Sequence, residues 1–196
     1  NIFGLQPAAG TVVSLAVREI ARQYLQEIQM VQMAGPYYLG CYCADAAVAF
    51  EIAQQLRYQG QSVAFLAFLD VLWKPQEYRF RHWYTLLKFG LGYLPYKIRQ
   101  QWKFIKWLLV LSRHKLTAKF YRRAARPVPG KLQNLLFVEA YYKALEEYVP
   151  QLYEGRITLF LSQDSFFKYS SELERVAKGG VELYEVPGYH EDLFDM

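Results

Sequence analysis

The sequence predicts an α/β fold with a mainly parallel sheet, in which helices flank the strands. Short apolar runs bounded by turn residues alternate along the chain with longer segments whose apolar residues recur at helical spacing. Such alternation is the pattern of strand–helix–strand units. The chain has 196 residues, of which 53% are hydrophobic and 21% are charged, so it can bury the core of one sizeable domain.

Five apolar runs have the length and the flanking turns of strands. They cover residues 1–6, 37–40, 62–69, 157–162 and 181–186. The run 62–69 is continuously apolar, which is typical of a strand that is buried on both faces of a parallel sheet. Helices are expected between Thr11 and the Gly35-Pro36 break, and over 44–58, 133–148 and 171–178.

Two cysteines stand one residue apart where the strand at 37–40 meets the helix at 44–58. A strand that turns sharply into a helix exposes the residue at the corner and leaves backbone N–H groups free beside it, which is a nucleophile elbow. We expect Cys43 to be the nucleophile at this corner and the N–H of Ala44 to supply part of an oxyanion hole. Cys41 is expected to be a small buried side chain.

An acid and a base follow Cys43 in the order nucleophile, acid, base. Asp70 ends the strand after the elbow helix, and His190 lies in a glycine-containing loop after the last strand. The carboxyl ends of parallel strands meet at one edge of a sheet, so we expect these three side chains to lie together. Asp164, which follows the strand at 157–162, is the alternative acid. The structural alternatives are that Asp70 caps a turn and that His190 is an ordinary loop histidine.

These motifs resemble the thioesterase domains of nonribosomal peptide and polyketide synthetases. Gly-Pro-Tyr-Tyr-Leu-Gly-Cys-Tyr-Cys-Ala-Asp-Ala-Ala-Val-Ala-Phe-Glu over 35–51 is similar to their elbow, usually Gly-Gly-Tyr-Ser-x-Gly-Gly, and to the helix that follows. Residues 64–70 resemble their strand that ends in the triad aspartate. Residues 153–160 and 185–190 resemble their late strand and their histidine loop.

The resemblance implies an α/β-hydrolase-like fold and a Cys43–His190–Asp70 triad. It also implies hydrolytic or cyclising release of an acyl or peptidyl chain from the phosphopantetheine thioester of a carrier protein, with no cofactor on this chain. A non-catalytic or vestigial carrier-binding domain, and an acyltransferase that passes the acyl group to another molecule, are the alternative functions.

Three features depart from the family pattern. The nucleophile is Cys43 rather than serine, and the small residues beside the elbow, normally glycine, are Cys41 and Asp45. Asp45 therefore brings a β-carbon and a carboxylate into a turn that usually has neither. No strand carries the family's early His-Pro-x-Gly-Gly loop, so we expect the N-terminal strands of the fold to be missing from this chain.

A basic segment separates the two halves of the core. Residues 78–126 hold 13 Lys and Arg and no Asp or Glu, which leaves 10 basic and 18 acidic residues elsewhere. We divide the one domain into a first core part over 1–77, a basic aromatic helical lid insertion over 78–130 and a second core part over 131–196.

The charge of this insertion has three interpretations. In the first, it forms lid helices whose apolar residues pack inward. Those residues are Trp83, Leu86, Leu87, Trp102, Ile105 and Leu108. In the second, the insertion docks an acidic carrier protein. The first two interpretations are compatible, and we favour both. In the third, it attaches to an anionic membrane surface or to nucleic acid, but no nucleic-acid-binding signature accompanies the charge.

The cysteine content and the hydropathy indicate in which compartment the protein works and which kinds of site it can hold. Two cysteines at this spacing make a poor disulfide, which favours a reducing compartment and a cytoplasmic protein. No apolar run reaches the roughly 18 residues of a membrane-spanning helix. A metal site is not expected, because the three histidines are far from the cysteines and from one another in the sequence.

Overall fold

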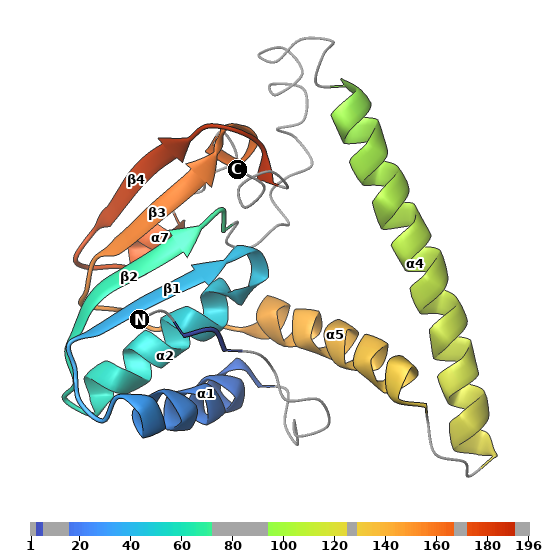
Figure 1. Ribbon diagram of the computed structural model, residues 1–196, viewed down its shortest axis with the longest axis horizontal. Helices are drawn as coiled ribbons and strands as arrows, with labels where there is room; N and C mark the ends of the chain where they lie inside the picture. The colour runs from blue at the N-terminus through green and yellow to red at the C-terminus, as the bar shows by residue number, and fades with distance from the viewer. Residues whose placement is uncertain (1–2, 6–15, 72–93, 125–128, 167–171, 191–196) are drawn as a thin grey trace.

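The computed structural model describes residues 3–5, 16–71, 94–124, 129–166 and 172–190, and the structural statements below concern these residues. Four strands form one sheet (Figure 1), and every neighbouring pair is parallel. They are β1 (Tyr37–Tyr42), β2 (Val63–Leu69), β3 (Ile157–Ser162) and β4 (Val181–Val186), and their order in the sheet follows the chain. All four carboxyl ends therefore lie along one edge.

The core lies between this sheet and the helices α1 (Val17–Val31), α2 (Ala46–Tyr58) and α7 (Glu172–Val176). The first half of α2 is rich in buried alanines, which lets the helix approach the sheet closely. One buried cluster joins Phe50 of α2 to apolar residues of β2 and β3 and to Leu173 of α7. A second cluster joins α1 to α2 and to Tyr37 of β1, and Figure 1 shows these two helices side by side.

The opposite face of the sheet is only partly covered. Tyr38 and Phe65 are paired across β1 and β2, and both are exposed. On the same face, Phe160 of β3 stacks on Tyr184 of β4, with ring centroids 5.4 Å apart. The prediction that the strand at 62–69 is buried on both faces is therefore wrong at its start, where Ala64 and Phe65 are exposed. A continuous apolar run does not show which of its two faces meets a neighbour.

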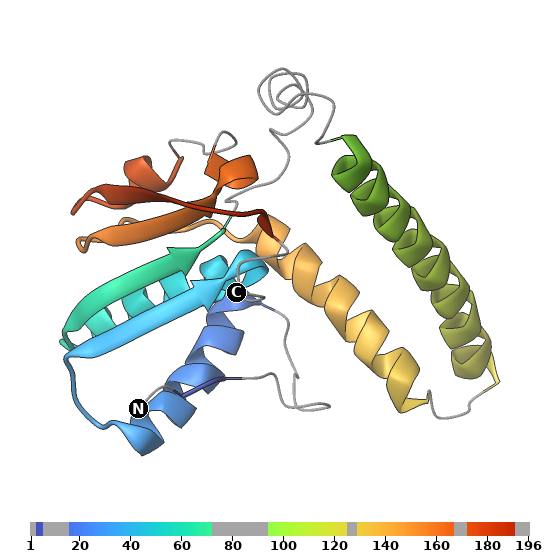
Figure 2. The same cartoon turned by 45° about the horizontal axis from the view of Figure 1, so that its top comes forward.

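Two further helices form an arm beside the core. α4 (Leu94–Arg123) and α5 (Gly130–Glu147) contact each other, and Figures 1 and 2 both show α5 between the sheet and α4. The expectation that Trp102, Ile105 and Leu108 pack inward is wrong, because these side chains are 60%, 44% and 41% exposed. The other three residues of that prediction, Trp83, Leu86 and Leu87, lie outside the described residues.

Most of the remaining elements agree with the sequence patterns. The strands at 157–162 and 181–186 have the expected bounds, and β1 continues two residues beyond the expected strand. Residues 3–5 form no strand, so the strand expected over 1–6 is wrong there, and the rest of that range lies outside the described residues. The short helix α6 (Gln163–Phe166) was not expected. Among the helices of the described ranges, none is both long and apolar enough to traverse a bilayer.

Candidate active site

Cys43 lies at the corner between β1 and the helical turn η1 (Cys43–Asp45), which leads directly into α2. Its backbone φ is 55°, in the left-handed region that residues with a β-carbon rarely adopt. The residue before it, Tyr42, is still extended, with φ −122° and ψ 142°. This change of direction within one residue is the geometry expected of an elbow. The Cys43 side chain is partly exposed at the carboxyl edge of the sheet.

Asp70 follows β2 at the same edge, and its side chain is buried. Its Oδ1 accepts hydrogen bonds from the backbone N–H and from the hydroxyl of Ser162, each 2.8 Å long. Its Oδ2 accepts a 3.1 Å hydrogen bond from the hydroxyl of Ser165 and contacts the Nδ1 of His190. The backbone φ of Asp70 is 49°, so this residue also turns sharply as it leaves its strand.

His190 reaches this edge from the segment that follows β4. Its Nδ1 forms a hydrogen bond and an ion pair with Asp70 Oδ2, and Cys43 lies near enough to the ring to raise the pKa of this imidazole. The structure thus brings His190 and Asp70, which are far apart in the sequence, into contact at the edge of the sheet where Cys43 lies.

These contacts shift the ionisation of both charged groups. The hydrogen bond to Asp70, and next the one to Cys43, raise the pKa of His190 to about 10, although burial opposes the shift. Burial raises the pKa of Asp70, but the hydrogen bonds from His190 and from Ser162 outweigh it, so this pKa lies below its usual value. At neutral pH the pair therefore consists of a carboxylate and an imidazolium.

Tyr42, which precedes the elbow cysteine, also holds His190. The phenol and imidazole rings are stacked, with centroids 5.1 Å apart and planes 13° from parallel. The Tyr42 hydroxyl donates a 2.7 Å hydrogen bond to the backbone carbonyl of His190, and its oxygen lies 3.3 Å from Nε2. No sequence pattern pointed to Tyr42, because this contact joins residues that are far apart in the chain.

Asp45 does not strain the elbow as its β-carbon suggested. Its φ of −82° and ψ of 3° are accessible to residues with side chains, and its carboxylate points to α5. There Oδ1 accepts a 2.6 Å hydrogen bond from the hydroxyl of Tyr141. Burial, and then this bond, raise the pKa of Tyr141. The carboxylate that departs from the family pattern thus connects the elbow to the arm.

The other predicted residues are placed as follows. Ala44 is the second residue of η1, directly after Cys43. Cys41 is partly buried against the core cluster, and burial, followed by the charge of Asp45, raises the pKa of its thiol. Asp164 belongs to α6, but its side chain lies outside the described residues. In the described part of the chain, no group of three His, Cys, Asp or Glu residues could hold a metal ion.

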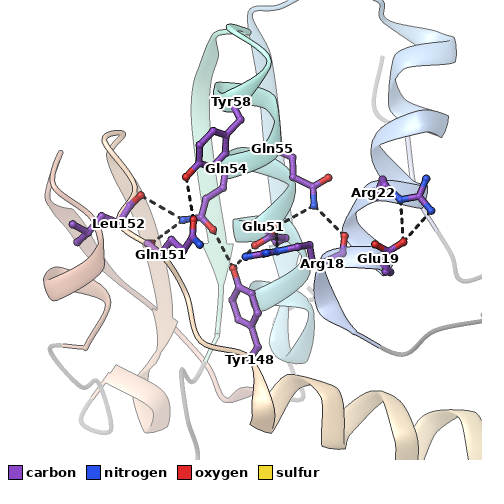
Figure 3. A network of polar contacts seen from close by, with 10 residues as sticks. All are labelled: Arg18, Glu19, Arg22, Glu51, Gln54, Gln55, Tyr58, Tyr148, Gln151 and Leu152. Carbon is purple, nitrogen blue, oxygen red and sulfur yellow. Dashed lines mark hydrogen bonds and ion pairs between the residues drawn. The ribbon is translucent and has the colours of Figure 1, made fainter.

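A second polar cluster lies on the helical side of the molecule, and none of its residues belongs to the candidate site (Figure 3). The buried Glu51 carboxylate accepts hydrogen bonds from Tyr148 at 2.8 Å and Gln55 at 3.0 Å, and it lies 3.5 Å from Arg18 Nε. A pocket of about 430 Å³ adjoins it. The pocket is lined by Arg18, Glu19, Arg22, Glu51, Gln54, Gln55, Tyr58 and Gln151. Its charged residues pair with one another, so this cluster ties α1, α2 and the segment after α5 together.

Parts of this chain are similar in sequence to known proteins. Residues 12–87 match the family model described as thioesterase domain. Microperfuranone synthase of Emericella nidulans is 38% identical over 55 residues, which are 28% of this chain. Malpinin synthetase of Mortierella alpina is 35% identical over 82 residues, or 40% of this chain. The chain spans 6% and 1% of the lengths of these two curated relatives.

Solved structures share the fold over nearly the whole chain. The NocB thioesterase domain from the nocardicin cluster matches with a TM-score of 0.59 and 20% identity, over 97% of this chain and 72% of that one. A four-domain nonribosomal peptide synthetase bound to AMP and glycine matches with a TM-score of 0.60 and 24% identity, over 94% of this chain and 15% of that one. In its α/β-hydrolase-like fold, and in the sequence of its first part, this chain therefore resembles the thioesterase domains of nonribosomal peptide and polyketide synthetases.

Proposed function

We propose that this chain is a thioesterase domain that releases an acyl or peptidyl chain from the phosphopantetheine arm of a carrier protein through an acyl-enzyme on Cys43. The observation that carries the proposal is the contact between His190 and Asp70 beside Cys43, which lies at a sharp strand-to-helix turn. The matching family model and the shared fold support the class of reaction.

In the acylation step, Cys43 attacks as a thiolate that the protonated His190 stabilises. Its sulfur bonds to the carbonyl carbon of the thioester, and the carbonyl oxygen takes the electron pair. The N–H of Ala44 would donate to this oxyanion, because the first N–H groups of a helical segment have no acceptor within the helix. The carbon–sulfur bond to pantetheine then breaks, and His190 gives its proton to the departing thiolate.

After this transfer His190 is neutral, and it can act as a base in the second step. Acylation also removes the charge from the Cys43 sulfur, so one of the two hydrogen bonds that raise the pKa of His190 is weakened. Nε2 then takes a proton from water, or from an amine or hydroxyl of the bound chain, as that group attacks the acyl carbon. Cys43 leaves as a thiolate, and the imidazolium beside Asp70 is restored.

The use of sulfur has a consequence for the product. An acyl group on Cys43 remains a thioester, whereas an ester on serine would lose part of the activation that the carrier thioester had. Such an intermediate can react with a weak nucleophile. Exclusion of water by the arm would then favour cyclisation over hydrolysis.

The direct test is the intact mass of the protein after incubation with an acyl-pantetheine thioester. We expect the mass to rise by one acyl group in the wild type and to stay unchanged in Cys43→Ala. Cys41→Ala is the matched control, because it removes the neighbouring thiol, and it should still be acylated. A wild type that is neither acylated nor consumes the thioester, or equal labelling of Cys43→Ala, would refute the proposal and favour a non-catalytic carrier-binding domain.

Product analysis separates the remaining enzymatic alternative. With water as the sole acceptor, a thioesterase should turn over and release free acid or cyclic product. A domain that stays acylated until a second molecule is added would be an acyltransferase instead. Cys43 must be reduced for either reaction, so a reducing compartment such as the cytoplasm belongs to this proposal.

A further inference from the structure

The outermost helix, α4, carries an apolar stripe that no element of the described structure covers. The stripe consists of Ile98, Trp102, Ile105, Leu109, Leu116 and Phe120. Their separations of four, three, four, seven and four positions place them on one face of a helix. Each of these side chains is between 44% and 71% exposed. Leu108 and Val110, 41% and 43% exposed, lie beside the stripe on opposite sides.

The stripe faces away from the body of the molecule. On the opposite side of α4, Leu111 and Ala118 are buried, and Lys115 forms an ion pair with Glu139 of α5. Figures 1 and 2 agree that α5 lies between α4 and the sheet. The side of α4 that holds Leu111 and Ala118 therefore packs on α5, and the stripe lies on the outer side.

Charge restricts what can cover the stripe. α4 holds nine Lys and Arg residues and no Asp or Glu. Arg99, Lys106 and Arg113 recur every seventh position along one border of the stripe, and all three are exposed. A second copy of this chain would bring two such borders together, and their like charges would repel. The surface therefore fits a partner that is negatively charged and also accepts large apolar side chains.

We propose that α4 is a membrane-surface helix that places this stripe in the headgroup region of an anionic lipid bilayer. A bilayer surface accepts Trp, Phe and Leu side chains on one side of a helix, while Lys and Arg at the borders contact lipid phosphates. The proposal does not depend on the proposed function, because α4 contains none of the candidate site residues.

The experiment measures binding of the whole chain to two kinds of vesicle, phosphatidylcholine alone and phosphatidylcholine mixed with phosphatidylserine. Co-sedimentation gives the partition coefficient, and a blue shift of tryptophan fluorescence that Trp102→Gln abolishes reports burial of Trp102. We expect the wild type to bind the anionic vesicles at least about tenfold more tightly than the neutral ones. Equal binding to both, or no binding to either, overturns the proposal without any variant being made.

Two variants then test the two parts of the surface. Trp102→Gln combined with Leu109→Gln should lower the partition coefficient by about tenfold or more. The combined change of Arg99, Lys106 and Arg113 to Gln should lower it by about a hundredfold on anionic vesicles alone.

The matched control replaces exposed apolar residues away from the stripe. Met33 and Val149 are 85% and 77% exposed, and changing both to Gln should leave vesicle binding unchanged. If the Trp102 and Leu109 variant binds as the wild type does, the stripe does not contact lipid. If an acidic protein protects Trp102 while vesicles do not, the partner is that protein and the proposal fails.

Discussion

Asp70→Asn tests how the structure sets the charge of the His190 imidazole. The hydrogen bond to Asp70 is the largest of the causes that raise the pKa of His190 from 6.5 to about 10. Asparagine keeps the size of the side chain and removes its negative charge, so the imidazolium loses its ion-pair partner. We expect the pKa of His190 to fall toward its ordinary value, because only Cys43 then remains to raise it and burial lowers it.

The size of the effect follows from the two pKa values. At pH 8, a histidine with a pKa near 10 is almost fully protonated, whereas one with its ordinary value is protonated only about 3% of the time. The imidazolium that stabilises the Cys43 thiolate is therefore depleted by about thirtyfold at most in the variant. We expect the alkylation rate of Cys43 at pH 8 to fall by about tenfold or more.

The assay is alkylation by iodoacetamide between pH 5 and pH 10, with the labelled peptide identified by mass spectrometry. Cys41 serves as an internal reference, because burial raises the pKa of its thiol and it should react slowly in every variant. Asp164→Asn is the matched control, since Asp164 is the other candidate acid and should leave the profile of Cys43 unchanged.

Two results would refute this reasoning. If the pH profile of Cys43 alkylation is the same in Asp70→Asn as in the wild type, Asp70 does not set the charge of His190. If Asp164→Asn shifts the profile and Asp70→Asn does not, the acid of the site is Asp164. A melting temperature for each variant checks that loss of the hydrogen bonds from Ser162 has not unfolded the protein.

Three further predictions concern positioning and stability. Tyr42→Phe keeps the ring that stacks on His190 and removes the hydroxyl that donates to the backbone carbonyl of His190. The kcat for thioester turnover should therefore fall severalfold, with little change in KM. An unchanged kcat would exclude a positioning role for Tyr42. Tyr148→Phe deprives the buried Glu51 carboxylate of a donor and should lower the free energy of unfolding by about 1.5–3 kcal/mol in urea titrations. Tyr58→Phe removes a hydroxyl from an 80% exposed side chain and should lower the free energy of unfolding by less than about 0.5 kcal/mol. Equal losses in the Tyr148 and Tyr58 variants would show that burial of the Glu51 carboxylate does not make its hydrogen bond more valuable. Because its pKa is raised in the folded state, His190 stabilises the fold fully below its unfolded pKa of 6.5 and loses that contribution as the pH rises toward about 10. The melting temperature of His190→Ala should therefore approach that of the wild type as the pH rises between those values. If the difference between the two melting temperatures grows with pH instead, folding does not raise the pKa of His190.

Local patterns in the sequence were enough to predict the elements that carry the site. The strands at 157–162 and 181–186 have the predicted bounds, because each is a short apolar run between turn residues. The elbow followed from a cysteine at a strand–helix boundary, and its left-handed backbone agrees with that prediction. One further signal was available. Ser162 is the last residue of β3 and Asp70 directly follows β2, so both lie at the carboxyl ends of neighbouring parallel strands.

Contacts between distant segments could not be predicted in the same way. The stacking of Tyr42 on His190 and the bond from Tyr141 to Asp45 depend on how a loop and a helix pack against the elbow. Helical spacing predicted an apolar face on α4, but it could not show that Trp102 points outward and Leu111 inward. Apolar residues at helical spacing occur both on faces that are buried in the core and on exposed faces that bind a partner.

The sequence by itself determined the order of the strands and helices, the sharp corner at Cys43 and the identity of the acid and base candidates, because these depend on neighbouring residues and on the alternation of strand and helix. Only the tertiary structure decided which ring nitrogen of His190 meets Asp70, which side chains hold that imidazole, and which face of α4 remains uncovered. The physical reason is that hydrogen bonds, ring stacking and burial act over a few ångströms in space, whatever the separation of the residues along the chain.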